Sequence, residues 1–513
     1  MKRLIALFVL SLFLLPSLSH AQDFDAQFKA FEQQNQKSFQ HFSDSINKAF
    51  AEAMAENMRV FKGEPAKVKD PKPKPATPPS VKPEKVPEDL PKQDPVIDEV
   101  KPDKPQPTED KPGSADETPS PSEQTPVTEP EKQNKEEDPF EEFFPDLSKD
   151  DSPAYNLLEM DIFGQNISLM TDIFNHHLKG LKPSDVADFW ILLSEWNYQS
   201  QLELCQSKRQ EYNFNDWAIC QLIFKIAENT FPQEYNEQVV FSIFMMNQLG
   251  MDAKIGFTPS HLFCLIAIEQ QLYGVEFSII GDRNYYIFEL NPSHAEFESF
   301  KFSSYNHNFS SSIHPLDMSI REPLITEGNN DSKYNEQTVY IDIHQIELFS
   351  TYPQVDIDVY ANAKPSKTFC QSIKRIFAPK LRGLSSYDAV SMLLSYVQFS
   401  FEYATDDEQF GYEKPFFCEE SYYYPKNDCE DRSVLFSFLV RYLLNMDVVL
   451  IDYPGHIATA VHFDQPVEGT KFTYRGKSYV VCDPTYIGAS IGMEMPEFTP
   501  SDRTIIPLEA ITY

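Results

Sequence analysis

An internal repeat limits how this chain can fold more than any other feature of its sequence. Residues 234–261 align without a gap on residues 429–456, and both segments continue as a strand, a turn and a second strand. A similar helix-forming stretch precedes each copy. The identical positions are Val239 with Val434, Phe241 with Phe436, Ser242 with Ser437, Leu249 with Leu444, Met251 with Met446, Asp252 with Asp447, Pro259 with Pro454 and His261 with His456. The unbroken register favours a duplicated α+β unit over two unrelated α+β segments.

The two copies differ at the positions where chemistry would occur. Glu234 stands at the position of Cys429, and Asn291 stands at that of Asp483. Glutamate is not a thiol nucleophile, and asparagine stabilises a charged imidazole less well than aspartate does. We therefore expect the first copy to be catalytically silent and to serve as a scaffold or as one wall of a substrate site. The second copy also carries a long aromatic insertion before its cysteine, residues 404–427.

Changes in composition divide the chain into six predicted parts. They are a signal peptide at 1–21, an amphipathic helix at 22–62, a disordered linker at 63–138, a degenerate first repeat at 139–300, a connecting β-rich segment at 301–380 and a catalytic second repeat at 381–513. In the connecting segment, the alternation in QTVYIDIHQIELF and PQVDIDVYA predicts strands, whereas SKTFCQSIKRIFAPKL predicts a short helix.

The N-terminal parts indicate export. Lys2 and Arg3 precede a short apolar run, and the small residues at 19–21 suit cleavage before Gln22. The helix predicted at 22–62 has an apolar face, which we expect to dock a partner protein, to self-associate or to pack on its own chain. The linker holds eighteen of the 39 prolines and no aromatic residue, so it cannot bury enough apolar surface to become ordered. The predicted location is the periplasm, the cell envelope or the extracellular space.

Charge and cysteine usage exclude several classes of partner. The formal net charge of −34 argues against nucleic acid, because phosphate binding requires a basic face. Beyond the predicted signal, no apolar run reaches the ~18 residues of a membrane helix, so we expect no membrane-spanning segment. The seven cysteines show no zinc-type spacing, and we expect neither a metal nor a cofactor. An odd number of cysteines leaves at least one thiol without a disulfide partner in the chain.

Three residues of the second copy have the side chains that a thiol enzyme needs. Cys429 precedes a helix-forming stretch, and a helix N-terminus stabilises a thiolate through its free N–H groups and partial positive charge. His456 opens one strand and Asp483 ends another, so neighbouring antiparallel strands would bring the two side chains together. The imidazole would then act as acid and base, and the carboxylate would orient it. The alternatives are a structural role for Cys429 in the core, and His462 as the base.

This arrangement resembles the transglutaminase-like superfamily, a branch of the papain-like thiol fold. The matching residues are Asp428-Cys429 with the helix that follows, Gly455-His456, and Asp483-Pro484-Thr485, within roughly residues 385–490. The resemblance implies a helix packed on an antiparallel sheet, amide acyl chemistry through a cysteine thioester, and no cofactor. Ala458 stands where the family usually has an aromatic residue, which affects the expected substrate groove more than the three site residues.

The sequence therefore predicts an exported thiol enzyme that cleaves or transfers acyl groups of peptide or isopeptide amides, with a protein or peptide as substrate. Hydrolysis is favoured because water is abundant, and protein-glutamine transglutaminase activity is the alternative among enzymes. A non-catalytic binding or scaffold protein of the cell envelope is the alternative outside that class. Burial of Cys429, or a disulfide from Cys429 to Cys418 or Cys482, would favour the binding protein.

Overall fold

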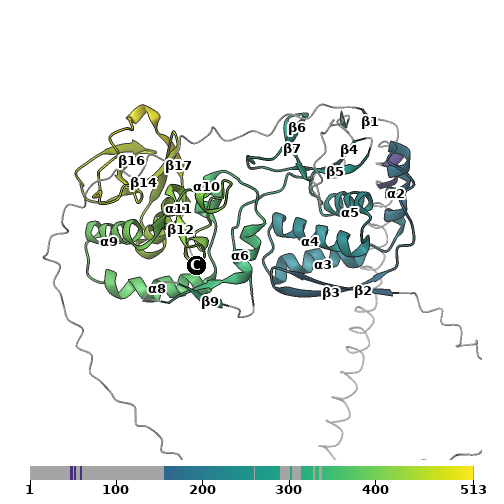
Figure 1. Cartoon of the computed structure of the whole chain (residues 1–513), viewed down its shortest axis with the longest axis horizontal. Coiled ribbons are helices and arrows are strands. Elements are labelled where there is room, and N and C mark those ends of the chain that lie inside the picture. The colour runs from purple at the N-terminus through teal and green to yellow at the C-terminus, as the bar shows by residue number, and fades with distance from the viewer. Residues whose placement is uncertain are drawn as a thin grey trace, which may run out of the picture. The chain divides into compact units, whose positions relative to one another are not determined.

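The computed structural model describes most of the chain from residue 155 onward (Figure 1). The described ranges are 155–258, 260–288, 301–302, 313–326, 330–333 and 338–511, together with residues 45, 47–49, 51–52 and 58–59. Helices alternate with mostly antiparallel strands in these ranges, so the predicted α+β class is confirmed. The predicted signal peptide at 1–21 and the predicted linker at 63–138 lie outside the described residues.

The described part of the first repeat contains a hairpin, four helices and a four-stranded sheet. The hairpin strands are β2 (Tyr155–Ile162) and β3 (Gln165–Asp172). The helices are α2 (Pro183–Glu195), α3 (Gln199–Glu211), α4 (Asp216–Thr230) and α5 (Tyr235–Gln248). The sheet strands are β4 (Ala253–Phe257), β5 (Leu262–Ala267), β6 (Phe277–Ile280) and β7 (Arg283–Phe288). Helix α5 packs on β4 and β5, and most of its residues are buried, so it is the central helix of this repeat.

The second repeat has the same order of parts, with insertions. Its two main helices are α9 (Ser386–Ser400) and α11 (Cys429–Leu444). Its sheet strands are β13 (Val448–Tyr453), β14 (His456–His462), β15 (Lys471–Tyr474), β16 (Lys477–Cys482) and β17 (Thr504–Pro507). The smaller elements are β11 (Glu402–Tyr403), α10 (Asp406–Gln409), the 3-10 turns η2 (Glu420–Tyr422) and η3 (Pro500–Asp502), and β12 (Lys426–Asn427). Helix α11 packs between α9 and the strands β13 and β14.

The sheets of the two repeats have the same strand order. The first sheet runs β4-β5-β7-β6, and the second runs β13-β14-β16-β15, with β17 added beside β13. An ion pair across the start of the sheet also recurs. Asp252 binds Arg283 at 2.6 Å in the first repeat, and Asp447 binds Lys477 at the corresponding place in the second. This correspondence supports the interpretation of the sequence repeat as a repeated fold unit.

The prediction of a β-rich segment at 301–380 is wrong, because helices hold more of its described residues than strands do. The helices are α6 (Ile343–Ser350), α7 (Ile357–Asn362) and α8 (Lys367–Leu381), and α8 is the helix that the sequence predicted. The strands are short: β8 (Lys301–Phe302), β9 (Asn330–Lys333) and β10 (Val339–Asp342). The alternation ends at Asp342, whose carboxylate accepts a hydrogen bond from the His344 N–H and caps α6. A short apolar run of this kind fits the spacing of apolar residues in a strand as well as that in a helix. The N-cap at Asp342 favours the helix.

Part of the N-terminal region packs on the first repeat. Residues 45, 47–49 and 51–52 are helical, as predicted for 22–62. Asn47 is buried and accepts a hydrogen bond of 2.7 Å from Gln248 at the end of α5. The prediction of helix as far as residue 62 is wrong, because β1 (Met58–Arg59) is a strand that pairs with β8. The described residues of this region therefore contact their own chain, which is one of the three expected partners.

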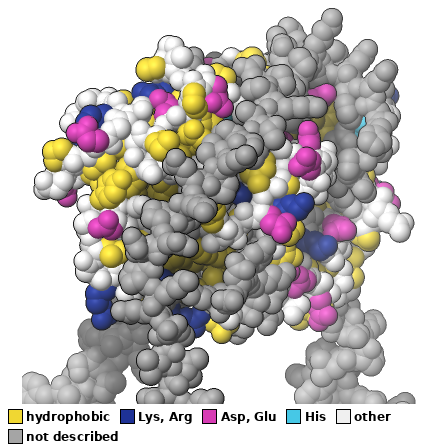
Figure 2. All heavy atoms as spheres, turned by 60° about the vertical axis from the view of Figure 1, so that its left-hand side comes forward, with side chains coloured by type: hydrophobic (Ala, Val, Ile, Leu, Met, Phe, Trp, Pro, Cys, Tyr) yellow, Lys and Arg dark blue, Asp and Glu magenta, His cyan; other side chains and the backbone are white. Residues whose placement is uncertain are grey.

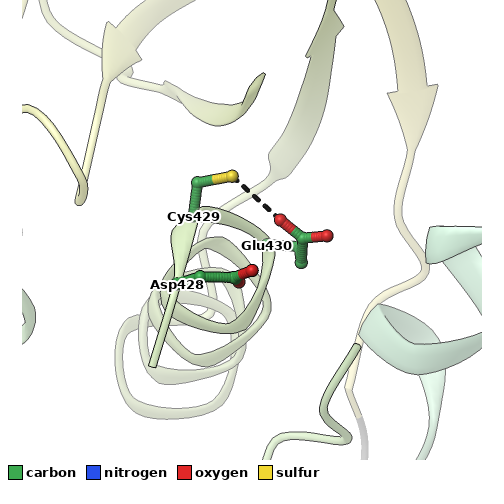
Figure 3. A group of neighbouring side chains, drawn as sticks. All are labelled: Asp428, Cys429 and Glu430. Atoms are coloured by element: carbon green, nitrogen blue, oxygen red, sulfur yellow. Dashed lines mark hydrogen bonds between the residues drawn. The ribbon is translucent and has the colours of Figure 1, made fainter. Parts of the chain in front are cut away.

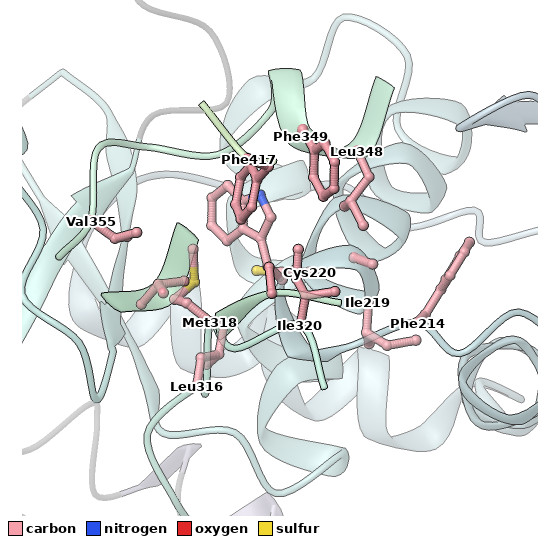
Figure 4. Close-up of a cluster of buried hydrophobic side chains, with 14 of the residues drawn as sticks. Phe214, Ile219, Cys220, Leu316, Met318, Ile320, Leu348, Phe349, Val355 and Phe417 are labelled. Atoms are coloured by element: carbon pink, nitrogen blue, oxygen red, sulfur yellow. The ribbon is translucent and has the colours of Figure 1, made fainter. Parts of the chain in front are cut away.

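The aromatic insertion of the second repeat contributes to the main hydrophobic core. Phe417 stacks on Phe349 with the ring centroids 4.1 Å apart, in the cluster drawn in Figure 4. Its ring also contacts Tyr360 at 4.6 Å and Tyr352 at 5.0 Å. Ile219 of α4 belongs to the same cluster, so the insertion shares a core with the first repeat.

The surface combines charged and apolar side chains. On the face drawn in Figure 2, hydrophobic side chains lie among acidic and basic ones. Phe399 at the end of α9 and Tyr412 in the insertion are each 60 % exposed. Within the part of the chain that the structure describes, no helix combines the length and the apolar character that crossing a membrane requires.

Candidate active site

Helix α11 begins at Cys429 because the residues around it form a complete cap. Asp428 occupies the N-cap position, and its carboxylate accepts a hydrogen bond of 3.4 Å from the Asp431 N–H. The Asp431 carboxylate accepts one of 3.0 Å from the Asp428 N–H, which completes a capping box. Val434 and Phe438 bury the helix in the core beyond its first turn. The predicted position of Cys429 at the start of a core helix is therefore confirmed.

His456 and Asp483 meet because their strands are neighbours. Strands β14 and β16 pair antiparallel, His456 opens β14, and Asp483 directly follows β16. His456 Nε2 lies 2.9 Å from Asp483 Oδ2, so the predicted contact between the two side chains is confirmed. His462, the alternative base, instead has its Nδ1 2.8 Å from the Ser478 carbonyl oxygen.

Asp483 is held in place by the turn that follows it. Its Oδ1 accepts hydrogen bonds from the backbone N–H groups of Thr485 at 2.9 Å and Tyr486 at 3.1 Å. The turn is tied to α9, because the buried Gln398 amide donates to its carbonyl oxygens. The acceptors are Asp483, Tyr486 and Ala489, at 3.0–3.1 Å. One carboxylate oxygen is thus fixed by the backbone, and the other is free to hold the imidazole.

The imidazole of His456 has a raised pKa. Burial opposes its protonation, but the Asp483 carboxylate and the hydrogen bond and charge of Cys429 outweigh burial and raise the pKa from 6.5 to about 10. At neutral pH the ring is therefore an imidazolium. Because Nε2 faces Asp483, Nδ1 is the nitrogen left for the sulfur of Cys429.

Glu430 is a site residue that the sequence analysis missed. Its carboxylate is buried, and its Oε2 accepts a hydrogen bond of 2.8 Å from Cys429 Sγ (Figure 3). Glu430 therefore contacts the candidate nucleophile directly. An acidic residue in the first turn of a helix is also explained by the helix dipole, which is why the sequence alone does not indicate this contact.

Aromatic rings form one wall of the site. Phe498 stacks on the His456 imidazole with centroids 5.4 Å apart and ring planes 2° apart. Tyr453 stacks on Phe498 at 4.3 Å, and its hydroxyl donates to the Glu494 carboxylate. Arg503 holds both oxygens of that carboxylate, at 2.7 and 2.6 Å. These ring contacts and hydrogen bonds therefore hold the segment after Asp483 beside the imidazole.

The site is largely buried. Cys429 is 4 % exposed and His456 is 8 % exposed. All seven cysteines lie in the described part of the chain, and each is buried and free of a disulfide. The disulfides to Cys418 or Cys482 that would have favoured a binding protein are therefore not observed, whereas the burial of Cys429 is.

The first repeat presents a different set of side chains at the corresponding positions. Glu234 is the N-cap residue of α5, at the position of Cys429. His261 precedes β5, and its Nδ1 lies 2.9 Å from Ser260 Oγ. Asn291 lies outside the described residues. The described part of this repeat therefore has no thiol at the start of its central helix, and its catalytic silence stays a prediction.

Two groups of buried side chains near Cys429 have the donors to bind a cation. Asp428, Cys429 and Glu430 each offer one ligand atom within 4.8 Å of the others, and so do Asp406, Asp428 and Asp431. The second group accepts backbone hydrogen bonds from the insertion. Burial and the neighbouring carboxylates also raise the pKa of Asp431. The hydrogen bonds of this second group to the helix cap and to the insertion explain why its carboxylates lie close together. We therefore assign no cation to the group.

The chain matches no family model, and no curated protein or solved structure is detectably similar to it. The resemblance to the transglutaminase-like superfamily therefore stays a prediction from the residues of the second repeat.

Proposed function

We propose that this chain is an exported thiol enzyme of transglutaminase-like type that cleaves or transfers amide acyl groups of proteins or peptides. The observation that carries the proposal is the 2.9 Å contact between His456 and Asp483, with Cys429 close enough to help raise the pKa of the same imidazole. A nucleophile, an acid–base group and an orienting carboxylate are thereby brought together. The packing of α11 on β13 and β14 supports a papain-like core.

Acylation would begin with attack of the Cys429 thiolate on the amide carbonyl carbon. The new C–S bond turns the carbonyl oxygen into an oxyanion, whose collapse breaks the C–N bond. His456 gives its proton to the leaving amine, and Asp483 keeps the ring oriented. Since part of the raised pKa of His456 comes from Cys429, loss of the thiolate charge lowers that pKa and favours the proton transfer.

Deacylation would use the neutral His456 as a base. A water molecule gives a proton to the imidazole and attacks the thioester carbon, and the C–S bond breaks to restore the thiolate and the imidazolium. An amine in place of water would give a new amide, which is transglutamination when the acyl group comes from glutamine. We favour hydrolysis, because water needs no acceptor site of its own.

The first repeat is proposed to be a degenerate copy that supports the active one. Its sheet has the same strand order as the second, but Glu234 replaces the nucleophile. We propose that the enzyme is exported to the periplasm, the envelope or the extracellular space, because the N-terminal sequence has the charged and apolar parts of a signal peptide.

A non-catalytic binding or scaffold role is the second candidate, and one observation favours it. Cys429 is only 4 % exposed, so a peptide reaches its sulfur only if a covering segment moves. The hydrogen-bonded His456 and Asp483 weigh against this role, because a binding protein needs neither an imidazolium nor its carboxylate.

A chromogenic ester tests the enzyme proposal on the full-length mature protein. With p-nitrophenyl acetate, we expect a burst of nitrophenolate and an acetyl group on Cys429 in the mass spectrum, because an activated ester forms the same thioester. Cys429→Ser should show neither. Adding a primary amine such as monodansylcadaverine separates hydrolysis from transfer, since only transfer gives the acetylated amine. An unmodified Cys429 in the wild type would leave the binding role as the better account.

A further inference from the structure

Asn427 has a buried side chain without hydrogen-bond partners. It lies in β12, it is 0 % exposed, and neither its Nδ2 nor its Oδ1 is bonded to any residue that the structure describes. Buried amides are nearly always paired, because losing water without gaining a partner is costly. An unpaired one beside a candidate nucleophile therefore needs an explanation.

The backbone between this amide and the nucleophile is extended, which favours the same side for both side chains. Asp428, between Asn427 and Cys429, has φ −101° and ψ −154°, which is extended. Side chains two residues apart in extended backbone project to the same side. The pairing of Asn427 with Tyr403 in the parallel β11–β12 ladder fixes the direction of this strand.

The amide of Cys429 is a second free donor at the same place. An N–H in the first turn of a helix has no intrahelical acceptor. The cap does not supply one here, because the Asp428 carboxylate accepts from the Asp431 N–H instead. Among the described residues, no acceptor is bonded to the Cys429 N–H.

We propose that Asn427 Nδ2 and the Cys429 N–H form the oxyanion hole of the enzyme, which makes Asn427 a catalytic residue. This inference rests on the proposed function. When the thiolate attacks, the carbonyl π electrons move to oxygen, and the two N–H groups donate to the resulting anion. An unpaired amide suits this task, because its N–H group gains a hydrogen-bond acceptor only when the oxyanion forms.

Two other polar side chains in the area are compared with Asn427. Thr485 Oγ1 is buried without a partner and follows Asp483 by two residues, so it is a competing donor. Arg432 also has unpaired nitrogen atoms, but its guanidinium lies over the Tyr403 ring and its Nη2 donates to the Phe401 carbonyl. The Arg432 guanidinium therefore packs against β11 and is not a donor to the reacting carbonyl.

Acylation and alkylation rates measured on the same variants test the assignment. Asn427→Ala and the similarly sized Asn427→Leu should slow acetylation of Cys429 by p-nitrophenyl acetate by about 10²- to 10³-fold at saturating ester, with the half-saturating concentration unchanged. Alkylation of Cys429 by iodoacetamide should keep its rate and pH profile, because displacement at a saturated carbon forms no oxyanion.

The controls separate this inference from the enzyme proposal. Ser421→Ala removes another buried, unpaired polar atom of the same loop and should change neither rate. Equal slowing of acylation and alkylation in the Asn427 variants would show a structural role, and a loss confined to Thr485→Val would move the donor to Thr485. Unchanged acylation in Asn427→Ala would overturn the oxyanion-hole assignment and leave the enzyme proposal standing. A wild-type Cys429 that the ester does not acylate would overturn the enzyme proposal itself.

Discussion

Asp483→Asn is expected to slow acylation of Cys429 by about 10²- to 10⁴-fold while leaving the fold intact. The amide oxygen of the substituted side chain can still accept the backbone hydrogen bonds of the turn. Its amide nitrogen, however, would face His456 Nε2 as a donor, so Nε2 must accept and Nδ1 must carry the proton. A neutral ring with an N–H toward the sulfur cannot take the thiol proton. The measurement is the rate of nitrophenolate release in single turnover.

Asp447→Asn provides the matched control. Its carboxylate belongs to the same repeat, but the side chain is 46 % exposed and pairs with Lys477 rather than with the imidazole. We expect wild-type acylation in this variant. Wild-type acylation in Asp483→Asn would contradict the role that we give to the carboxylate.

Phe417→Ala should produce the largest loss of stability among single substitutions in the aromatic insertion. The ring is 1 % exposed and packs on Phe349, Tyr352 and Tyr360. Truncating a buried phenylalanine removes these contacts and leaves a cavity, which costs about 3–5 kcal/mol. Guanidinium titration followed by circular dichroism measures the free energy of unfolding.

Tyr412→Ala is the control within the same insertion. This ring is 60 % exposed, and removing it should change the free energy of unfolding by no more than about 0.5 kcal/mol. If Phe417→Ala costs no more than Tyr412→Ala does, the insertion is not anchored in the core in the way that Figure 4 shows.

Local patterns predicted the central parts of the site. The helix-forming stretch after Cys429 predicted where α11 begins, and the capping box of Asp428 and Asp431 is the physical reason for that start. Gly476 is typical of a hairpin turn, and it lies between β15 and β16, the strand before Asp483. The repeat then predicted two similar units, in agreement with the common strand order of their sheets.

Long-range contacts explain what the sequence could not predict. Phe498 contacts the His456 ring because of how the segment after Asp483 packs. No local spacing of residues in the sequence indicates this contact. Glu430 lies next to Cys429 in sequence, yet its contact with the sulfur depends on side-chain orientation at the helix start. The sequence predicted a strand where α6 lies, because an apolar run of that length fits the spacing of a strand as well as that of a helix. The Asp342 cap, which distinguishes the two, is seen only in the structure.

The pH dependence of thiol alkylation, mapped to individual cysteines, tests the central claim most directly. Burial raises the thiol pKa of five other cysteines, which should therefore react slowly: Cys205, Cys220, Cys264, Cys418 and Cys482. Cys429 should instead be the fastest of the seven and stay reactive below pH 7, because His456, with its pKa raised to about 10, remains an imidazolium beside it.

His456→Ala should remove that advantage and slow alkylation of Cys429 at pH 6 by about tenfold or more, because the sulfur loses its cationic partner. Both results together would establish the thiolate–imidazolium pair on which the proposed chemistry depends. A Cys429 that stays inert in the wild type, or that reacts at the same rate without His456, would contradict the enzyme account and leave a binding protein.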